Sequence, residues 1–161
     1  MIDLRSDTVT LPPQKMKEFM FQAPIGDDVY GEDPSINELQ EYASALFGKE
    51  SALFVPSGTM ANLVSVLSHC NRGDEVILGD KSHIFVYEVG GISAYGGIHS
   101  HQLNNNEDGT IDMEKIENAI RTDDVHFPKT KLISLPTLKI KIYGLKMRNC
   151  RIAECRKINS V

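Results

Sequence analysis

The sequence predicts an α/β domain in which a mostly parallel β-sheet carries helices on both faces. Short apolar segments suited to buried strands alternate along the chain with segments whose apolar residues recur at helical spacing. Alternation of this kind favours parallel pairing, because each helix carries the chain back across the sheet to the next strand. At 161 residues without an internal repeat, the chain is long enough for one domain with a substantial core.

Two helices are expected before the first strand. Residues 13–22 place three large apolar side chains on one face, and the proline at the start suits the first turn of a helix. The sequence Ser-Ile-Asn-Glu at residues 35–38 has the spacing of a capping box, in which the serine and glutamate side chains bond to free backbone amides. Apolar residues at helical spacing continue to Phe47, and Gly48 is expected to end this helix.

The rest of the chain is expected to alternate between strands and helices. Apolar runs predict strands at residues 51–55, 75–78, 98–103 and 131–135. Helical spacing predicts helices at residues 60–69 and 82–89, and a third helix capped by the side chain of Asp112. The polar residues 104–109 are expected to form a turn.

The charge of the chain is divided unequally along its length. The net charge of −5 combines net −11 in residues 1–135 with net +6 in residues 136–161, so these two segments are treated as separate parts. The basic segment has no glycine-rich or aromatic interleaving and no RNA-binding signature, and nucleic acid is therefore not expected as a partner. No apolar stretch is long enough to span a bilayer, and residues 1–5 do not resemble a signal peptide.

Cysteine usage indicates the cellular compartment. The sequence contains three cysteines, Cys70, Cys150 and Cys155, and their number is odd and their spacing does not suit a metal site. This usage fits a reducing compartment better than a disulfide framework, so a cytoplasmic location is expected.

A phosphate-binding turn is one interpretation of residues 57–59. Ser57, Gly58 and Thr59 lie between a predicted strand and a predicted helix, where free backbone amides and the positive end of the helix dipole attract an anion. Glycine permits close approach, and the two hydroxyl groups add donors. The alternative is an ordinary capped helix start, because no Gly-Lys-Ser/Thr sequence or dinucleotide-binding pattern accompanies the turn.

Two histidines are candidates for chemistry. His83 begins a predicted helix and His126 lies in an acidic loop, and either imidazole suits a base, a stacking partner or a solvent-facing side chain. The other histidines do not add the spacing of a zinc site, so no metal is expected. The acidic segment 27–33 lacks the spacing of a calcium loop and is interpreted as an exposed loop.

Several motifs occur together in a characteristic order. They are Asp-Leu-Arg-Ser-Asp-Thr-Val-Thr at residues 3–10, Gly-Asp-Asp-Val-Tyr-Gly-Glu-Asp-Pro at 26–34, Pro-Ser-Gly-Thr-Met-Ala-Asn at 56–62, Glu-Val-Gly-Gly at 88–91, and His-Phe at 126–127 followed by Thr-Lys-Leu-Ile-Ser-Leu at 130–135. In this order they resemble the low-specificity threonine aldolases of the aromatic-amino-acid β-eliminating lyase family. The resemblance covers residues 2–135 and then ends abruptly.

The resemblance implies a large domain of the PLP-dependent transferase-like fold type I, truncated after residue 135. It also implies pyridoxal 5′-phosphate (PLP) as cofactor, with its phosphate held by Ser57, Gly58 and Thr59 and its ring stacked on His83. Glu88 is implied as an assistant near His83. The implied reaction is retro-aldol cleavage of L-threonine or L-allo-threonine to glycine and acetaldehyde.

The resemblance further implies how an amino-acid substrate is bound. His83 and His126 would contact the substrate β-hydroxyl group, and one of them would accept its proton directly or through water. Ser6 would help to hold the substrate carboxylate. Tyr30 would reach the active site of a neighbouring subunit, which implies a homodimer or homotetramer with shared active sites.

The sequence departs from the family pattern after Leu135. In that family, later strands supply an aspartate for the pyridine nitrogen, an arginine for the substrate carboxylate and the Schiff-base lysine, and none of these has a counterpart in this chain. Codons for residues 136–141, shifted by two nucleotides, can encode Asn-Thr-Gln-Asn-Lys, which is close to the family's continuation. A frameshift, alternative splicing or a wrongly predicted exon is therefore one hypothesis for residues 136–161. A chain that ended at Val161 would lack half of the expected sheet, and we would expect it to be poorly soluble.

Three further interpretations remain open at this stage. The first is a non-catalytic remnant that binds PLP weakly or associates with an intact paralogue. The second is a related β-eliminating lyase that acts on another amino acid. The third is an unrelated binding module with a basic tail.

Overall fold

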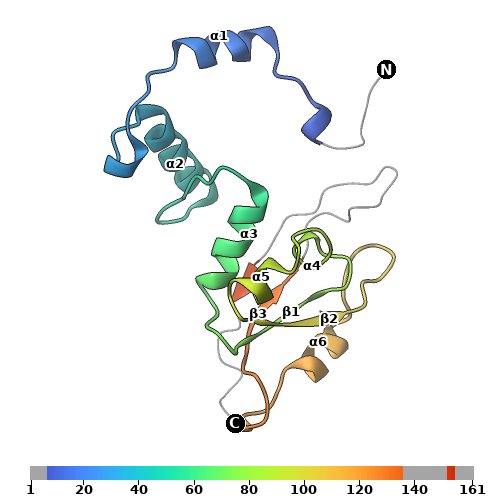
Figure 1. Ribbon diagram of the computed structural model, residues 1–161. Helices are drawn as coiled ribbons and strands as arrows, with labels where there is room; N and C mark the ends of the chain where they lie inside the picture. Colours follow the sequence, from blue (N-terminus) through green and yellow to red (C-terminus); the bar gives the residue numbers. More distant parts are fainter. Residues whose placement is uncertain (1–6, 136–151, 155–161) are drawn as a thin grey trace. The chain divides into compact units, whose positions relative to one another are not determined.

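Residues 7–135 and 152–154 are described by the computed structural model, and contacts between residues divide the chain into two units (Figure 1). The first unit is Met1–Phe54 and the second is Val55–Val161, a division that the sequence did not indicate. The first unit contains η1 (Asp7–Val9), α1 (Gln14–Gln22), η2 (Asp28–Tyr30) and α2 (Pro34–Phe47).

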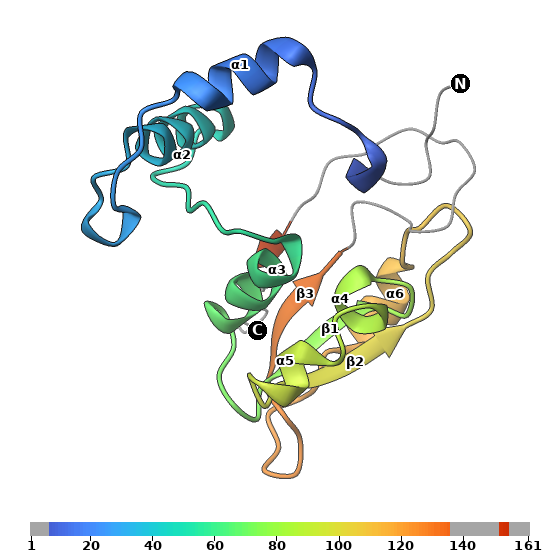
Figure 2. The same cartoon turned by 45° about the horizontal axis from the view of Figure 1, so that its top comes forward.

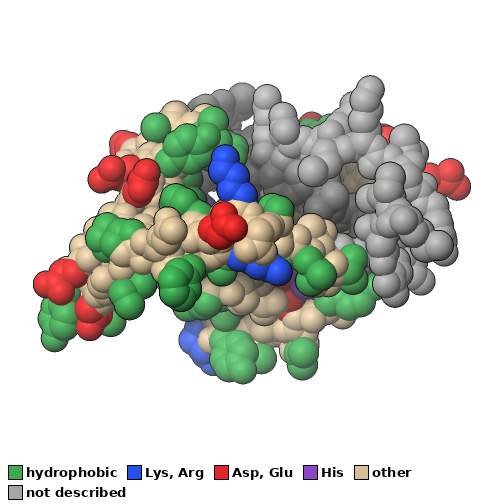
Figure 3. Space-filling model, turned by 90° about the horizontal axis from the view of Figure 1, so that it is seen from above, with side chains coloured by type: hydrophobic (Ala, Val, Ile, Leu, Met, Phe, Trp, Pro, Cys, Tyr) green, Lys and Arg blue, Asp and Glu red, His purple; other side chains and the backbone are tan. Residues whose placement is uncertain are grey.

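Helix α1 confirms the first predicted helix. It begins directly after Pro13, whose φ of −65° is already close to the helical value. The helix buries none of its residues, and Phe19 and Phe21 are 71% and 92% exposed. Figure 3 shows hydrophobic side chains standing out over much of the described surface that is seen from above.

Helix α2 is confirmed, but the prediction that a capping box begins it is wrong. The N-cap is Asp33, whose Oδ1 accepts a hydrogen bond from the backbone N–H of Ile36 at 2.9 Å. Hydrogen bonds from the amides of Ile36 and Gly26 hold the pKa of Asp33 below its usual value. Ser35 instead donates to the carbonyl oxygen of Pro24, because a carboxylate two residues earlier already occupies the capping position. Gly48 ends the helix in the left-handed conformation, as predicted.

The predicted strand at residues 51–55 is also wrong. This segment has no regular secondary structure, and Leu53 and Phe54 are 71% and 48% exposed. Its apolar composition suits a buried strand, but a strand forms only beside a neighbour, and no described residue pairs with this segment.

The second unit contains the sheet, whose strand order is β2-β1-β3-β4. Strand β1 (Glu75–Gly79) pairs in parallel with β2 (His99–Leu103) on one side and with β3 (Thr130–Ser134) on the other. The register aligns Ile77 with His101 and with Ile133. Strand β4 (Ile152–Glu154) is antiparallel to β3 and was not expected. The predicted mostly parallel sheet is confirmed, while the remaining residues of the basic segment lie outside the described part of the chain.

Helices cover both faces of this sheet, as predicted. Figures 1 and 2 show α3 (Gly58–Leu67), α4 (His83–Val86) and α5 (Gly91–Ala94) over one face and α6 (Met113–Ala119) over the other. In the described part of the chain, no helix has the length and apolar character needed to cross a membrane.

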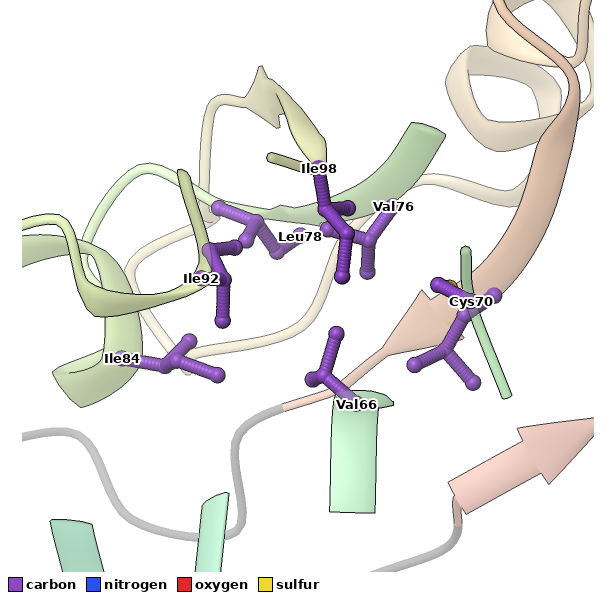
Figure 4. Packing of buried hydrophobic residues seen from close by; sticks show 8 residues of the cluster. Val66, Cys70, Val76, Leu78, Ile84, Ile92 and Ile98 are labelled. Carbon is purple, nitrogen blue, oxygen red and sulfur yellow. The ribbon is translucent and has the colours of Figure 1, made fainter. Parts of the chain in front are cut away.

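The hydrophobic core lies between β1 and the helices of the first face. Side chains alternate along a strand, so Val76 and Leu78 point to the same face. There they pack against Val66 of α3, Ile84 of α4 and Ile92 of α5 (Figure 4). Ile77 points to the opposite face and is also fully buried. Strand β1 is therefore enclosed on both faces and paired on both edges.

The predicted helix at residues 82–89 is shorter than expected. Helix α4 ends at Val86, and the chain turns through Val89 and Gly90, whose φ angles are 55° and 65°. A positive φ is unusual for a β-branched residue, and it breaks the helical path so that α5 begins as a separate helix at Gly91.

Helix α6 confirms the helix predicted after Asp112, but not the predicted cap. The carboxylate of Asp112 accepts hydrogen bonds from Lys115 Nζ at 2.6 Å and from Asn106 Nδ2 at 2.8 Å, and it makes no cap hydrogen bond to the helix. The charged lysine side chain competes successfully for this carboxylate, and these hydrogen bonds lower the pKa of Asp112.

A buried carboxylate joins the three parallel strands at the start of β1. The side chain of Glu75 is fully buried, and its oxygens accept hydrogen bonds from Arg121 Nε at 2.8 Å and from Thr130 Oγ1 at 3.0 Å. His101 Nδ1 and His99 Nε2, both on β2, lie 3.3 and 3.5 Å from the same carboxylate. Burial raises the pKa of Glu75, but the hydrogen bonds from Arg121, Thr130 and His101 outweigh burial, so the pKa is lower than usual.

We expect the core at β1 to dominate stability. Replacing Leu78 with alanine removes a fully buried side chain and leaves a cavity, and should lower the free energy of unfolding by about 2–5 kcal/mol. Urea unfolding of the full chain measures this change. The control is Met113→Ala, because Met113 is 65% exposed, and equal losses in the two variants would contradict the assigned core.

We also expect acid to weaken the sheet through Glu75. A carboxylate with a lowered pKa binds fewer protons in the folded than in the unfolded chain, so its stabilisation is complete above its usual value of 4.5 and is lost as the pH falls below it. Urea unfolding at a series of pH values should show a smaller loss of stability on acidification in Glu75→Gln than in the unchanged protein. The exposed Glu107→Gln variant is the control, and identical pH profiles for all three proteins would contradict the prediction.

Candidate active site

The candidate site lies where the carboxyl end of β1 leads into α4. Parallel sheets bind ligands at this edge, because the loops that follow the strands gather there. The chain runs from Gly79 through residues 80–82 to His83, the first residue of α4. Helix α4 contacts α3. This contact connects the loop after β1 with the helix that begins at Gly58.

The start of α3 offers the donors predicted for a phosphate. Ser57 is the N-cap, and its Oγ accepts a hydrogen bond from the N–H of Met60 at 3.1 Å. The first amides of a helix have no acceptor within the helix, so those of Gly58 and Thr59 are left for a ligand. All three residues of the turn are exposed, and among the described residues, apart from its chain neighbours and its own helix backbone, no atom lies within 4 Å of the position where a Cβ of Gly58 would be. The amides, the hydroxyl groups and the open space above the glycine fit a phosphate group.

His83 is held by a buried carboxylate. Its Nδ1 lies 2.7 Å from Oε1 of Glu88, whose side chain is 3% exposed, whereas half of the His83 side chain is exposed. An ionised carboxylate only accepts hydrogen bonds, so this contact favours the tautomer that has the proton on Nδ1 and the lone pair on Nε2. The Tyr87 ring lies beside the imidazole, with ring centroids 5.4 Å apart. The arrangement suits a general base whose exposed nitrogen is Nε2.

The structure places His126 away from His83. His126 precedes β3, whose first residue pairs with the first residue of β1, while His83 follows the last residue of β1. Because the strands are parallel, the two histidines lie at opposite ends of the strands, His126 at the amino end and His83 at the carboxyl end. The His126 side chain is 83% exposed, and its Nδ1 and backbone N–H both contact Oδ1 of Asp124. A shared role of the two histidines on one substrate stays a prediction.

The remaining predicted site residues lie in the first unit. Tyr30 closes η2 and is 77% exposed, and Ser6 lies outside the described residues. In the acidic segment around Tyr30, Asp27 accepts a hydrogen bond from the amide of Val29 and thereby caps η2, and Asp33 caps α2. These two carboxylates therefore organise the loop itself.

One residue of the site was missed from the sequence. Asn62 lies in the first half of α3, and its Nδ2 donates to Oε1 of Glu88 at 2.6 Å. The sequence signals were its place at the end of the motif at residues 56–62 and its polar side chain on an otherwise apolar stretch of helix, between Ala61 and Leu63. Such a residue is also common on exposed helix faces, and the sequence alone does not show that a buried carboxylate lies opposite.

Comparison with known proteins identifies the family. The pattern of the beta-eliminating lyase family matches residues 3–144, which is most of the chain. The chain therefore belongs to the beta-eliminating lyase family, in agreement with its α/β fold.

Individual relatives confirm the resemblance to threonine aldolases. The chain is 53% identical over 135 residues to the low specificity L-threonine aldolase of Escherichia coli (strain K12), covering 84% of this chain and 40% of that protein. It is 56% identical over 137 residues to low-specificity L-threonine aldolase 1 of Arabidopsis thaliana, covering 83% and 38%. It is also 32% identical over 135 residues to alanine racemase TOXG of Cochliobolus carbonum, covering 83% and 35%. The chain spans about two-fifths of the length of these two threonine aldolases.

We expect Ser57 to stabilise the start of α3. Replacing Ser57 with alanine removes the acceptor for the amide of Met60 and should lower the free energy of unfolding by about 1 kcal/mol. The Ser57→Asn variant keeps a capping oxygen and should stay within a few tenths of a kcal/mol of the unchanged protein. Thermal or urea unfolding measures both variants, and an equal loss in both would contradict capping by this side chain.

Proposed function

We propose that this chain forms part of a PLP-dependent lyase that cleaves L-threonine and L-allo-threonine to glycine and acetaldehyde. The observation that carries the proposal is the His83–Glu88 pair in the same unit as an exposed helix start suited to a phosphate. The similarity to two proteins named as low-specificity L-threonine aldolases supports the choice of reaction.

The start of α3 would hold the cofactor. The amides of Gly58 and Thr59, the hydroxyl groups of the turn and the helix dipole would bind the PLP phosphate, and one face of the exposed His83 ring would be available for stacking. When bound, PLP supplies an electron-accepting ring for cleavage of the bond between Cα and Cβ. The fit of these residues to a phosphate rests on their donors, their exposure and the open space at Gly58.

His83 would move the proton. Its Nε2 would accept the proton of the substrate β-hydroxyl group, directly or through water, while Nδ1–H stays bonded to Glu88. The imidazolium formed in this way would be stabilised by the buried carboxylate. Glu88 therefore orients the ring before the transfer and compensates its charge afterwards.

Self-association would complete the site. Within one copy of the second unit, His126 and His83 lie at opposite ends of the parallel strands. A second copy would therefore have to supply His126 to the same substrate. Tyr30 and Ser6 are proposed to contribute to substrate binding in such a homodimer or homotetramer. Residues 1–135 would provide these groups as the N-terminal part of the PLP-binding large domain, and residues 136–161 would form a separate basic segment.

A cytoplasmic location fits the proposed enzyme. Cys70 is buried with a free thiol. Burial raises its pKa, and the charge of Asp74 adds to this effect. A thiol of this kind is stable in a reducing compartment and resists oxidation.

Two alternative functions are kept. One is a non-catalytic chain that binds PLP weakly or associates with an intact paralogue. The similarity to a protein named as an alanine racemase favours a related enzyme that acts on another amino acid. In both alternatives, the residues at the start of α3 would still bind the cofactor phosphate.

Cofactor binding tests the proposal. Gly58→Asp adds a negative charge where a phosphate would sit, in open space that accommodates the side chain, and should weaken PLP binding by about tenfold. Equilibrium dialysis of the full chain against PLP measures the change. Ser68→Asp, at the other end of the same helix, is the control and should bind PLP as the unchanged chain does. Equal binding by all three proteins would overturn the phosphate site.

Activity separates the alternatives. Acetaldehyde released from L-threonine or L-allo-threonine by the full chain with PLP would support the lyase. Binding of PLP without release of acetaldehyde would support the non-catalytic alternative, and faster turnover of a different amino acid would support the related enzyme.

A further inference from the structure

Glu88 receives two hydrogen bonds on one oxygen atom. Asn62 Nδ2 lies 2.6 Å from Oε1, and His83 Nδ1 lies 2.7 Å from the same Oε1. The side chain of Glu88 is 3% exposed, so water offers little competition for this oxygen. The three side chains come from α3, from the segment after α4 and from the first residue of α4.

The amide of Asn62 fixes the position of the carboxylate. A glutamate side chain has three rotatable bonds, and a single contact to His83 leaves the carboxylate free to pivot about that contact. A second donor on another helix removes this freedom, because Oε1 must satisfy both hydrogen bonds at once.

We propose that Asn62 is a positioning residue that acts through Glu88 to hold His83 as the Nδ1–H tautomer, with Nε2 directed to the substrate. The proposal rests on the proposed function for the use of Nε2, but the tautomer itself needs neither cofactor nor substrate. Asn62 touches neither in this assignment, and it acts only through the carboxylate.

Asn62 connects Glu88 to the same helix whose start would bind the phosphate. Asn62 follows Gly58 by four residues, which is about one helical turn, so the two lie one above the other on the same side of α3. The helix start that would bind the phosphate and the amide that holds Glu88 therefore move as one rigid piece. The distance between a bound phosphate and His83 is set by this helix and by two hydrogen bonds.

A purely structural role is the alternative for Asn62. In that case the amide only satisfies a buried carboxylate, and its loss lowers stability without changing His83. The two roles differ in one observable, the distribution of the proton between Nδ1 and Nε2 of the neutral imidazole.

The test is the tautomer of His83 measured by nitrogen and carbon NMR of the imidazole in the full chain without PLP. At alkaline pH, where imidazole is neutral, we expect a preference of about tenfold for Nδ1–H at His83. In Asn62→Ala and in Asn62→Asp, which keeps the shape but removes the N–H donor, the preference should fall at least about threefold. Asn62→Gln keeps an amide donor and should restore part of the preference. The exposed His69 is the internal reference and should not change in any variant.

Each outcome decides the proposal. Unchanged tautomers in folded Asn62→Ala and Asn62→Asp would overturn it and leave Asn62 a structural residue. If both variants fail to fold, Asn62→Gln still decides, because a preference below that of the unchanged protein supports the proposal and an unchanged preference overturns it, while His83 as the Nε2–H tautomer in the unchanged protein contradicts the assignment. Failure of the proposed function is separate, because it would appear as PLP binding insensitive to Gly58→Asp, whatever the tautomer.

Discussion

The enclosure of β1 is the constraint on which the rest of the second unit depends. All five residues of β1 are buried, with parallel partners on both edges and helices on both faces. A strand in this position must be apolar along nearly its whole length, because neither face meets water. Its one charged residue, Glu75, is tolerated only because Arg121, Thr130 and two histidines surround its carboxylate.

Two buried carboxylates serve opposite ends of the same strand. Glu75 stands at the start of β1 and joins β2, β3 and the segment before β3, so its hydrogen bonds hold the sheet together. Glu88 lies beyond the other end of β1 and joins α3 to His83, so in the proposed function its hydrogen bonds orient an exposed imidazole. A buried carboxylate without hydrogen-bond donors is costly, so both glutamates need partners. The partners of Glu75 connect strands, whereas those of Glu88 include the candidate base His83.

The family and the site support each other without settling the reaction. The helix start, the histidine and the buried glutamate lie within the segment shared with proteins named as threonine aldolases and as an alanine racemase. These groups have the donors to suit an anion and an imidazole to suit a base, which are needs common to several reactions of amino acids. The chain spans 40% of the length of the Escherichia coli relative and 35% of that of the Cochliobolus carbonum relative.

The sequence by itself determined the alternation of helices and parallel strands, because hydrophobic spacing is a local property that survives in the fold. It also determined the residues 57–59 and His83 as candidates, through their order in the chain and their resemblance to a family. Only the tertiary structure decided that residues 51–55 remain irregular, that Asp33 caps α2, and that Asn62 meets Glu88. Each of these depends on which group lies opposite in space, and spacing along the chain carries no record of that partner.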